Sequence, residues 1–309
     1  EWAARVEAQA QRLIRGRERD PNLVGYFIDN ELRWGVDWRV PHELFDDYLA
    51  LPREAAGRQA LLALLQARSG DDIARFNQAW GTTFASFAEL AAAPSLPSRG
   101  LSVAARADRS AFLSALARRF FSITTAAIRA HDGAHLILGA RFVGPLTPLE
   151  VATVAGEYLD VVSVNAYEYS VAPADILPAA ELGFVDTDTA LWLQGFHAAA
   201  GKPLLVTEFG FRARDSGLRN SFPPLYPTLA DQAERADRLA AYAGRCSAAP
   251  FIVGYHWFEY ADQPAAGRFD GEDNNWGLVT AGDDPYPALV ARSAAVNPCA
   301  PRCAPAGAR

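Results

Sequence analysis

Short apolar runs alternate along this chain with segments whose apolar residues recur at helical spacing. The runs are too short for a helical stripe and do not alternate strictly between apolar and polar positions. Strands that helices cover on both faces have this pattern, which is typical of parallel sheets. We therefore predict a parallel α/β architecture. The predicted strands lie within residues 22–30, 135–144, 159–169, 202–211 and 251–260.

The stretch from about residue 40 to residue 100 interrupts this order, because all of its patterns are helical. Apolar residues recur at helical spacing in three of its segments, ELFDDYLAL, GRQALLALLQARSG and DDIARFNQAWGTTFASFAEL. We interpret the stretch as a helical insertion after the first strand. The prediction is one main domain over residues 1–295 that contains this insertion, followed by a tail over residues 296–309.

Polar or functional side chains stand at the end of every predicted strand. In parallel α/β folds the C-terminal ends of the strands face the active site. A polar residue at one strand end is common, but such groups at the ends of all the predicted strands indicate a shared site. These residues are Asn30, Glu31, Arg141, Asn165, Tyr167, Glu168, Glu208, His256, Trp257 and Glu259.

Glu31 and Glu208 are the best pair among these residues for catalysis. Glycoside hydrolysis requires two carboxylates around one pocket, and in retaining enzymes one is the acid/base and the other the nucleophile. Two strand ends that face one site can supply them. The structural alternative is that Glu31 pairs with Arg33, and Glu208 with Arg212 or Arg214.

Two motifs around these acids resemble those of the clan A retaining glycoside hydrolases, which are TIM-barrel, or (β/α)8, enzymes. DNEL resembles the acid/base signature that ends strand four of the clan, and VTEFGF resembles the nucleophile strand, strand seven. The resemblance implies that Glu31 is the acid/base, that Asn30 hydrogen-bonds the sugar 2-hydroxyl and that Glu208 is the nucleophile. It also implies that this chain carries strands four to eight, with the helical insertion after strand four.

Strands one to three of such a barrel would lie outside this sequence. Without them the sheet would expose a long unpaired edge, which proteins avoid. We expect a further N-terminal segment of the same chain, or another chain, to supply them.

The resemblance also implies roles for residues at the later strand ends. Tyr167, ending strand six, would hydrogen-bond Glu208, and Trp257, ending strand eight, would be the platform beneath the sugar. We predict that Tyr167 and Arg141 keep Glu208 ionised, while the apolar strand before Glu31 favours its protonated form.

The remaining strand-end residues are predicted to bind substrate. Arg141, Asn165, His256 and Glu259 belong to this group, although His256 is almost as compatible with a place in the core. Trp34 and Trp38 fit either sugar stacking or core packing.

The segment GYHWFEYADQPAAGRFDGEDNNWGLV, residues 254–279, is similar to the loop after strand eight in family 50 agarases and related β-galactoside-acting enzymes. His-Trp-Phe, Asp-Gln-Pro, Gly-Arg and Asp-Gly-Glu follow in the same order. Glu272-Asp273-Asn274 departs from the agarase Glu-Asn form, and TEFGFRARDSGLRN also differs from the agarase versions. The resemblance implies a retaining β-glycosidase that hydrolyses β-linked galactose-containing oligo- or polysaccharides. The alternatives are a clan A hydrolase for another β-glycan, such as a β-glucan, and a non-catalytic carbohydrate-binding barrel.

Composition limits the partners. The net charge of −7 gives no basic field for nucleic acid or an anionic membrane. No stretch approaches the ~18 apolar residues that cross a bilayer. The histidines are scattered, CxxC is absent and DGEDN lacks EF-hand spacing, so we expect no metal or cofactor. The expected partner is the oligo- or polysaccharide substrate.

The three cysteines leave their pairing open. Cys299 and Cys303 could pair with each other or with Cys246. A disulfide would fit an exported protein, and we expect a secreted or periplasmic location.

Overall fold

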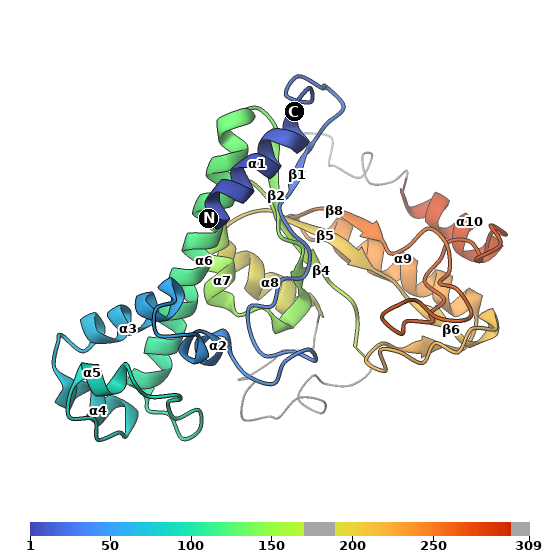
Figure 1. Ribbon diagram of the computed structural model, residues 1–309. Coiled ribbons are helices and arrows are strands. Elements are labelled where there is room, and N and C mark those ends of the chain that lie inside the picture. The colour runs from blue at the N-terminus through green and yellow to red at the C-terminus, as the bar shows by residue number, and fades with distance from the viewer. Residues whose placement is uncertain (170–188, 298–309) are drawn as a thin grey trace.

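Helices and short strands alternate along most of the computed structural model, which describes residues 1–169 and 189–297 (Figure 1). The helices are α1 (Trp2–Ile14), α2 (Leu44–Ala50), α3 (Ala56–Arg68), α4 (Ile73–Trp80), α5 (Phe87–Leu90), α6 (Val103–His131), α7 (Leu149–Gly156), α8 (Thr189–Ala200), α9 (Gln232–Ala248) and α10 (Pro287–Val296). The strands are β1 (Gly25–Phe27), β2 (Leu136–Gly139), β3 (Phe142–Val143), β4 (Val162–Asn165), β5 (Leu204–Phe209), β6 (Arg212–Ala213), β7 (Thr228–Leu229) and β8 (Ile252–Trp257).

The strands pair in parallel, as their apolar runs predict. β3, β4, β5 and β8 form one sheet in that order, and β1 pairs with β2. The segments of β2 and β4 are connected by a hydrogen bond from Asp160 N, before β4, to Ile137 O (3.1 Å) and by one from Arg141 N, after β2, to Ser163 Oγ (2.9 Å). Parallel pairing brings the C-terminal ends of β1, β4, β5 and β8 to the same edge of this layer.

Helices cover these strands and bury a continuous apolar core. α6, α7 and α8 pack successively against one another, and α9 packs against β8 and α10 (Figure 1). β4 is buried along its whole length, as the absence of a polar alternation predicts. Phe142 of β3, Val154 of α7 and Phe196 of α8 are among the buried side chains. Each such side chain stabilises the fold by about 1.5–3 kcal/mol relative to an exposed position.

The helices expected between residues 40 and 100 are present and have a core of their own. α2, α3, α4 and α5 pack beside the first half of α6. In this second core the ring of Trp80 stacks on Phe45 (5.4 Å between centroids) and on Phe76 (5.6 Å). The segment therefore buries its apolar faces against α6 rather than against the sheet.

α6 contributes to both cores. Its first turn is capped by Ser102, whose Oγ accepts a hydrogen bond from Ala105 N (3.0 Å). Phe112 is buried in the second core and Phe121 in the first. By length and composition alone α6 could cross a membrane, contrary to the expectation that no stretch approaches this requirement. Its packing in two cores accounts for its apolar character.

One of the three cysteines lies in the described part of the chain. Cys246 on α9 is a buried free cysteine, and burial raises the pKa of its thiol to about 12. Cys299 and Cys303 lie outside the described residues, so their predicted pairings stay predictions. Nearly all of the predicted tail, residues 296–309, also lies outside the described residues.

Replacement of Phe121 tests the role of α6 in the first core. This ring is fully buried and lies 5.8 Å from Trp34 and 6.2 Å from Phe142 between centroids. We expect Phe121→Ala to lower the free energy of unfolding by about 3–5 kcal/mol, because it leaves a cavity. Urea unfolding measures this loss. Val103→Ala, at a site 77% exposed on the same helix, is the control. Equal losses in the two variants would contradict the assignment.

Candidate active site

Glu31 follows β1 at a point where backbone hydrogen bonds still hold the chain beside β2. Ile28 N donates to Gly139 O (2.9 Å), and Glu31 N donates to Arg141 O (3.1 Å). Glu31 and Arg141 both have a left-handed backbone, with φ of 53° and 46°. Residues other than glycine adopt this conformation rarely, and such positions cluster at functional sites. The two strand ends thus support each other in an uncommon geometry.

Asn165, which ends β4, connects the residues that follow β1 to the middle of the sheet. Its side-chain Nδ2 donates to Glu31 Oε1 (2.9 Å) and approaches Asn30 Oδ1 (3.3 Å). Its Oδ1 accepts a hydrogen bond from Thr207 Oγ1 (2.8 Å). Because the Oδ1 is already engaged by Thr207, the amide presents its N–H groups to Glu31. The structure therefore brings together Asn30, Glu31 and Asn165.

Glu208 lies near the end of β5, and hydrogen-bond donors hold both of its carboxylate oxygens. Arg141 Nη2 donates to Oε1 (2.5 Å), and Tyr167 Oη donates to Oε2 (2.9 Å). Glu208 pairs in register with Asn165 of β4, which places it beside the residue that binds Glu31. The hydrogen bond expected between Tyr167 and Glu208 is present. Such charge-assisted bonds favour the ionised form of the carboxylate.

The electrostatic balance at Glu208 nevertheless differs from the prediction. Burial and, after it, the charge of Glu31 raise the pKa of Glu208 to about 7, although Arg141 and Tyr167 act to lower it. The two donors therefore limit the upward shift without reversing it. This is the expected behaviour of neighbouring carboxylates that share a buried site, where simultaneous ionisation is costly.

Within residues 1–169 and 189–297, neither acid pairs with the arginines of the structural alternative, and Glu208 pairs with Arg141 instead. Arg33 pairs with Asp47, on α2, and not with Glu31. Arg212 donates to Asn274 Oδ1 (2.7 Å) and to backbone carbonyls. The neighbouring strand-end acid Glu168 pairs with arginines of α9 and stands apart from this site.

An aromatic wall flanks Glu208. The ring of Tyr167 lies 4.8 Å from Tyr226, 5.5 Å from Trp276 and 6.4 Å from Phe258 between centroids. Burial raises the pKa of Tyr167 and Tyr226 well above the usual value, and the charges of Glu208 and Glu31 act in the same direction. Sequence reasoning missed Tyr226, because it lies in a proline-rich loop without strand periodicity. It also missed Phe258, although this residue directly follows the predicted platform residue.

The structure places Trp257 differently from the prediction. Its ring packs edge-on against Phe209 (5.4 Å between centroids), lies 6.2 Å from Phe211 and is covered by Arg235 of α9. Its indole N–H donates to Trp276 O (2.8 Å). Trp257 thus packs on the side of the strand that faces α9, whereas Phe258 contacts the tyrosine that binds Glu208.

The other predicted aromatic and polar residues divide between core and surface. Trp34 is a core residue, stacked on Phe121. Trp38 is 46% exposed and is covered by the guanidinium of Arg39 (4.9 Å). Neither Trp34 nor Trp38 contacts Glu208 among the described residues.

His256 and Glu259 both lie close to charged neighbours of the acidic pair. His256 is exposed as a whole residue. The burial that its side chain does have lowers its pKa, and the charge of Arg141 lowers this pKa further. Burial raises the pKa of Glu259, whose Oε1 has no hydrogen-bond partner in the described residues. Neither side chain hydrogen-bonds to the acidic pair within that part of the chain.

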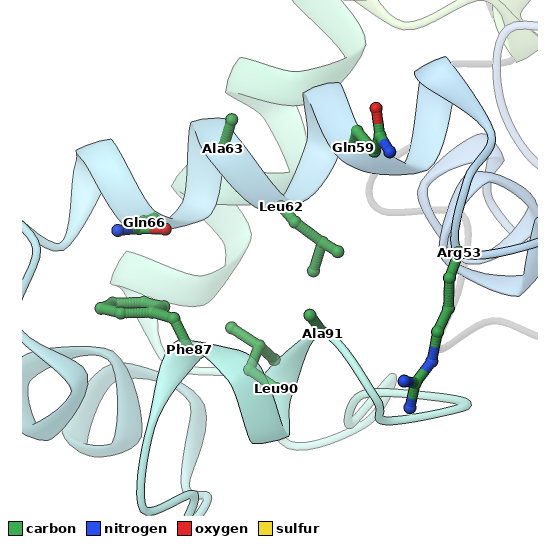
Figure 2. Close-up of a pocket in the computed structure, with 8 residues that line it drawn as sticks. All are labelled: Arg53, Gln59, Leu62, Ala63, Gln66, Phe87, Leu90 and Ala91. Atoms are coloured by element: carbon green, nitrogen blue, oxygen red, sulfur yellow. The ribbon is translucent and has the colours of Figure 1, made fainter.

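A hollow elsewhere on the molecule is separate from these groups. Figure 2 shows it between α3 and α5, in the helical segment, where its lining includes no carboxylate. Within residues 1–169 and 189–297, no three His, Cys, Asp or Glu side chains are grouped so that they could hold a metal ion. The residues that line the hollow are Arg53, Gln59, Leu62, Ala63, Gln66, Phe87, Leu90 and Ala91.

Known proteins confirm the resemblance to agarases that the motifs indicate. The sequence is 32% identical to β-agarase A of Vibrio sp. (strain JT0107) over 295 residues, covering 92% of this chain and 27% of that protein. The structure matches that of an exo-β-agarase with a TM-score of 0.78 at 32% identity, covering 96% of this chain and 37% of that one. This chain therefore spans well under half the length of these relatives. No model of a protein family matches the sequence.

A more distant likeness concerns the fold alone. A β-galactosidase from the psychrophilic Marinomonas ef1 matches with a TM-score of 0.60 at 18% identity, covering 96% of this chain and 40% of that one. The arrangement of strands and helices is thus shared with enzymes of the β-galactosidase type.

The raised pKa of Glu208 predicts a specific effect of pH on stability. A carboxyl group that binds its proton more tightly when folded destabilises the fold as pH rises from its ordinary pKa to the folded value of about 7. Glu208→Gln removes this cost. The difference in free energy of unfolding, variant minus wild type, should be about 2–3 kcal/mol larger at pH 8 than at pH 4. Denaturant unfolding at both pH values measures this, and a gap independent of pH would contradict the shift.

Proposed function

We propose that this chain forms the catalytic part of a retaining β-glycosidase that hydrolyses agarose or a related polysaccharide with β-linked galactose. The observation that carries this proposal is the pair Glu31 and Glu208, linked through Asn165 at neighbouring strand ends. The similarity to a β-agarase along nearly the whole chain supports the choice of substrate. A polysaccharide substrate also favours a secreted or periplasmic location, because such polymers do not enter cells intact.

The chain would supply strands four to eight of a (β/α)8 barrel. In this interpretation β1 is strand four, β2 with β3 is strand five, β4 is strand six, β5 is strand seven and β8 is strand eight. The parallel pairing of these strands and the match to an exo-β-agarase support it. Helices α2–α5 would be the insertion after strand four. Strands one to three would come from another part of the same protein or from a partner chain.

Hydrolysis would proceed by double displacement. Glu208 attacks the anomeric carbon, the glycosidic C–O bond breaks, and Glu31 gives its proton to the departing oxygen. Water then attacks the same carbon and gives a proton to Glu31, and the carboxylate of Glu208 leaves. Each carboxylate thus ends the cycle in its starting state.

The hydrogen bonds favour this division of roles. Both oxygens of Glu208 accept bonds from Arg141 and Tyr167, whereas Glu31 accepts one from Asn165. Donors stabilise the charged form of a carboxylate, so Arg141 and Tyr167 favour the charge that a nucleophile at Glu208 needs. The mutual repulsion that raises the pKa of Glu208 also makes simultaneous ionisation of the pair costly.

Other residues around the pair would bind the sugar. Exposed Asn30 can donate its side-chain N–H to the 2-hydroxyl, because its Oδ1 is directed to Asn165. Phe258, beside Tyr167, is better placed than Trp257 as the apolar platform. His256 and Glu259 would contact hydroxyl groups at the same edge.

Kinetics of two substitutions test the roles. We expect Glu208→Gln to lower turnover of agarose about 10³-fold or more, because the nucleophile is lost. Glu31→Gln should slow agarose hydrolysis similarly but spare aryl galactosides with good leaving groups, which need little protonation. Rates of sugar and phenol release give both quantities.

Glu168→Gln is the matched control for these variants. This acid also follows β4, but it pairs with Arg238 and Arg245 on α9. It should retain turnover within a few-fold of the wild type. Substantial activity in Glu208→Gln, or a loss in Glu168→Gln as large as in Glu208→Gln, would refute the assignment.

A further inference from the structure

Arg212 is a buried cation whose hydrogen bonds go to neutral groups. It is 1% exposed, and burial lowers the pKa of its guanidinium. Nη1 donates to Asn274 Oδ1 (2.7 Å) and to Pro223 O (3.2 Å), and Nη2 donates to Tyr226 O. Burial of a charge is costly unless the surroundings compensate it. The aromatic rings that the guanidinium contacts indicate the function of this buried charge.

The guanidinium of Arg212 lies over two rings of the aromatic wall. It is 5.9 Å from the ring centroid of Tyr226 and 5.6 Å from that of Trp276. These two rings come from different loops and lie 5.5 Å apart. Asn274 strengthens the connection, because its Nδ2 donates to Phe222 O (2.6 Å) in the loop of Tyr226. One cation therefore joins both loops.

Both rings then contact Tyr167. Their centroids lie 4.8 Å and 5.5 Å from that of Tyr167, whose hydroxyl donates to Glu208 Oε2 (2.9 Å). A buried ring that is packed on two sides has little freedom to rotate away from its acceptor. The orientation of the Tyr167 hydroxyl thus depends on the placement of Tyr226 and Trp276.

We propose that Arg212, together with Asn274, is a positioning residue that fixes the hydrogen bond from Tyr167 to Glu208 by holding the aromatic wall in place. The proposal rests on the nucleophilic role of Glu208 for its functional meaning. The charged or titratable groups with the largest effects on the pKa of Glu208 are Glu31, Arg141, Tyr167 and Glu272. The contacts of Arg212 are with the loops and rings that surround Tyr167, so we expect its influence on Glu208 to pass through Tyr167.

Titration of the Glu208 carboxyl in the full-length protein tests the proposal without any need for turnover. The carboxyl infrared band of Glu208 is identified by its loss in Glu208→Gln. Tyr167→Phe should raise the midpoint by roughly one pH unit, because a hydrogen bond to the ionised form is lost. Arg212→Lys keeps the charge but loses the forked donor geometry, and it should shift the midpoint in the same direction.

The double variant distinguishes positioning from a direct effect. If Arg212 acts through Tyr167, Arg212→Lys combined with Tyr167→Phe should shift the midpoint no further than Tyr167→Phe alone. Additive shifts, or an unchanged midpoint in Arg212→Lys, would overturn the proposal. Asn274→Ala, which removes the Nη1 acceptor, should shift the midpoint in the same direction and serves if Arg212→Lys does not fold.

Arg235 provides the matched control. It is fully buried, donates to Phe211 O (2.7 Å) and Gly277 O (2.8 Å), and covers the ring of Trp257. Arg235→Lys should lower thermal stability without moving the Glu208 midpoint. An equal movement in this variant would show general loosening and refute the specific role of Arg212. Hydrolysis by the wild type is measured separately, so a failure of the proposed function remains distinguishable.

Discussion

The burial of the Glu208 carboxyl beside the carboxyl of Glu31 is the constraint on which the rest of the site depends. Burial is the main cause that raises the pKa of Glu208 to about 7, and the charge of Glu31 adds to the rise. Arg141 and Tyr167 oppose this rise at Glu208, whereas Glu31 accepts one hydrogen bond from Asn165. The unequal donors give two chemically identical side chains different surroundings, and double displacement requires two carboxyl groups with different roles.

Several features around this pair of acids lower the stability of the fold. Glu31 and Arg141 adopt left-handed backbones, and the hydrogen bonds of the buried cation Arg212 in the described part of the chain go to neutral groups. Such features cost stability and persist where the surrounding structure fixes them. Here the surroundings are the packed helices around β4 and the aromatic wall beside Tyr167. Core packing thus supplies the stability, and the strand ends carry the polar groups.

The sequence predicted the features that depend on local pattern. Apolar runs indicated the parallel strands, and strand-end motifs indicated Glu31, Glu208 and the bond from Tyr167. Contacts between distant loops left no local signal, which is why Tyr226 and Arg212 were missed. The motif that indicated a platform role for Trp257 carries no information on the packing of its ring against Phe209, near which the register between β5 and β8 shifts. The pKa of Glu208 depends on burial that no short motif reveals.

The most direct test of the central claim is covalent trapping with an activated 2-deoxy-2-fluoro-galactoside, followed by intact mass and peptide mapping. The fluorine slows the second displacement more than the first when the leaving group is good, so a glycosyl-enzyme accumulates. The account predicts a mass increase of one fluorosugar, located on the peptide that contains Glu208. An adduct on another carboxylate would contradict it. So would the absence of any adduct in a protein that turns over the parent galactoside.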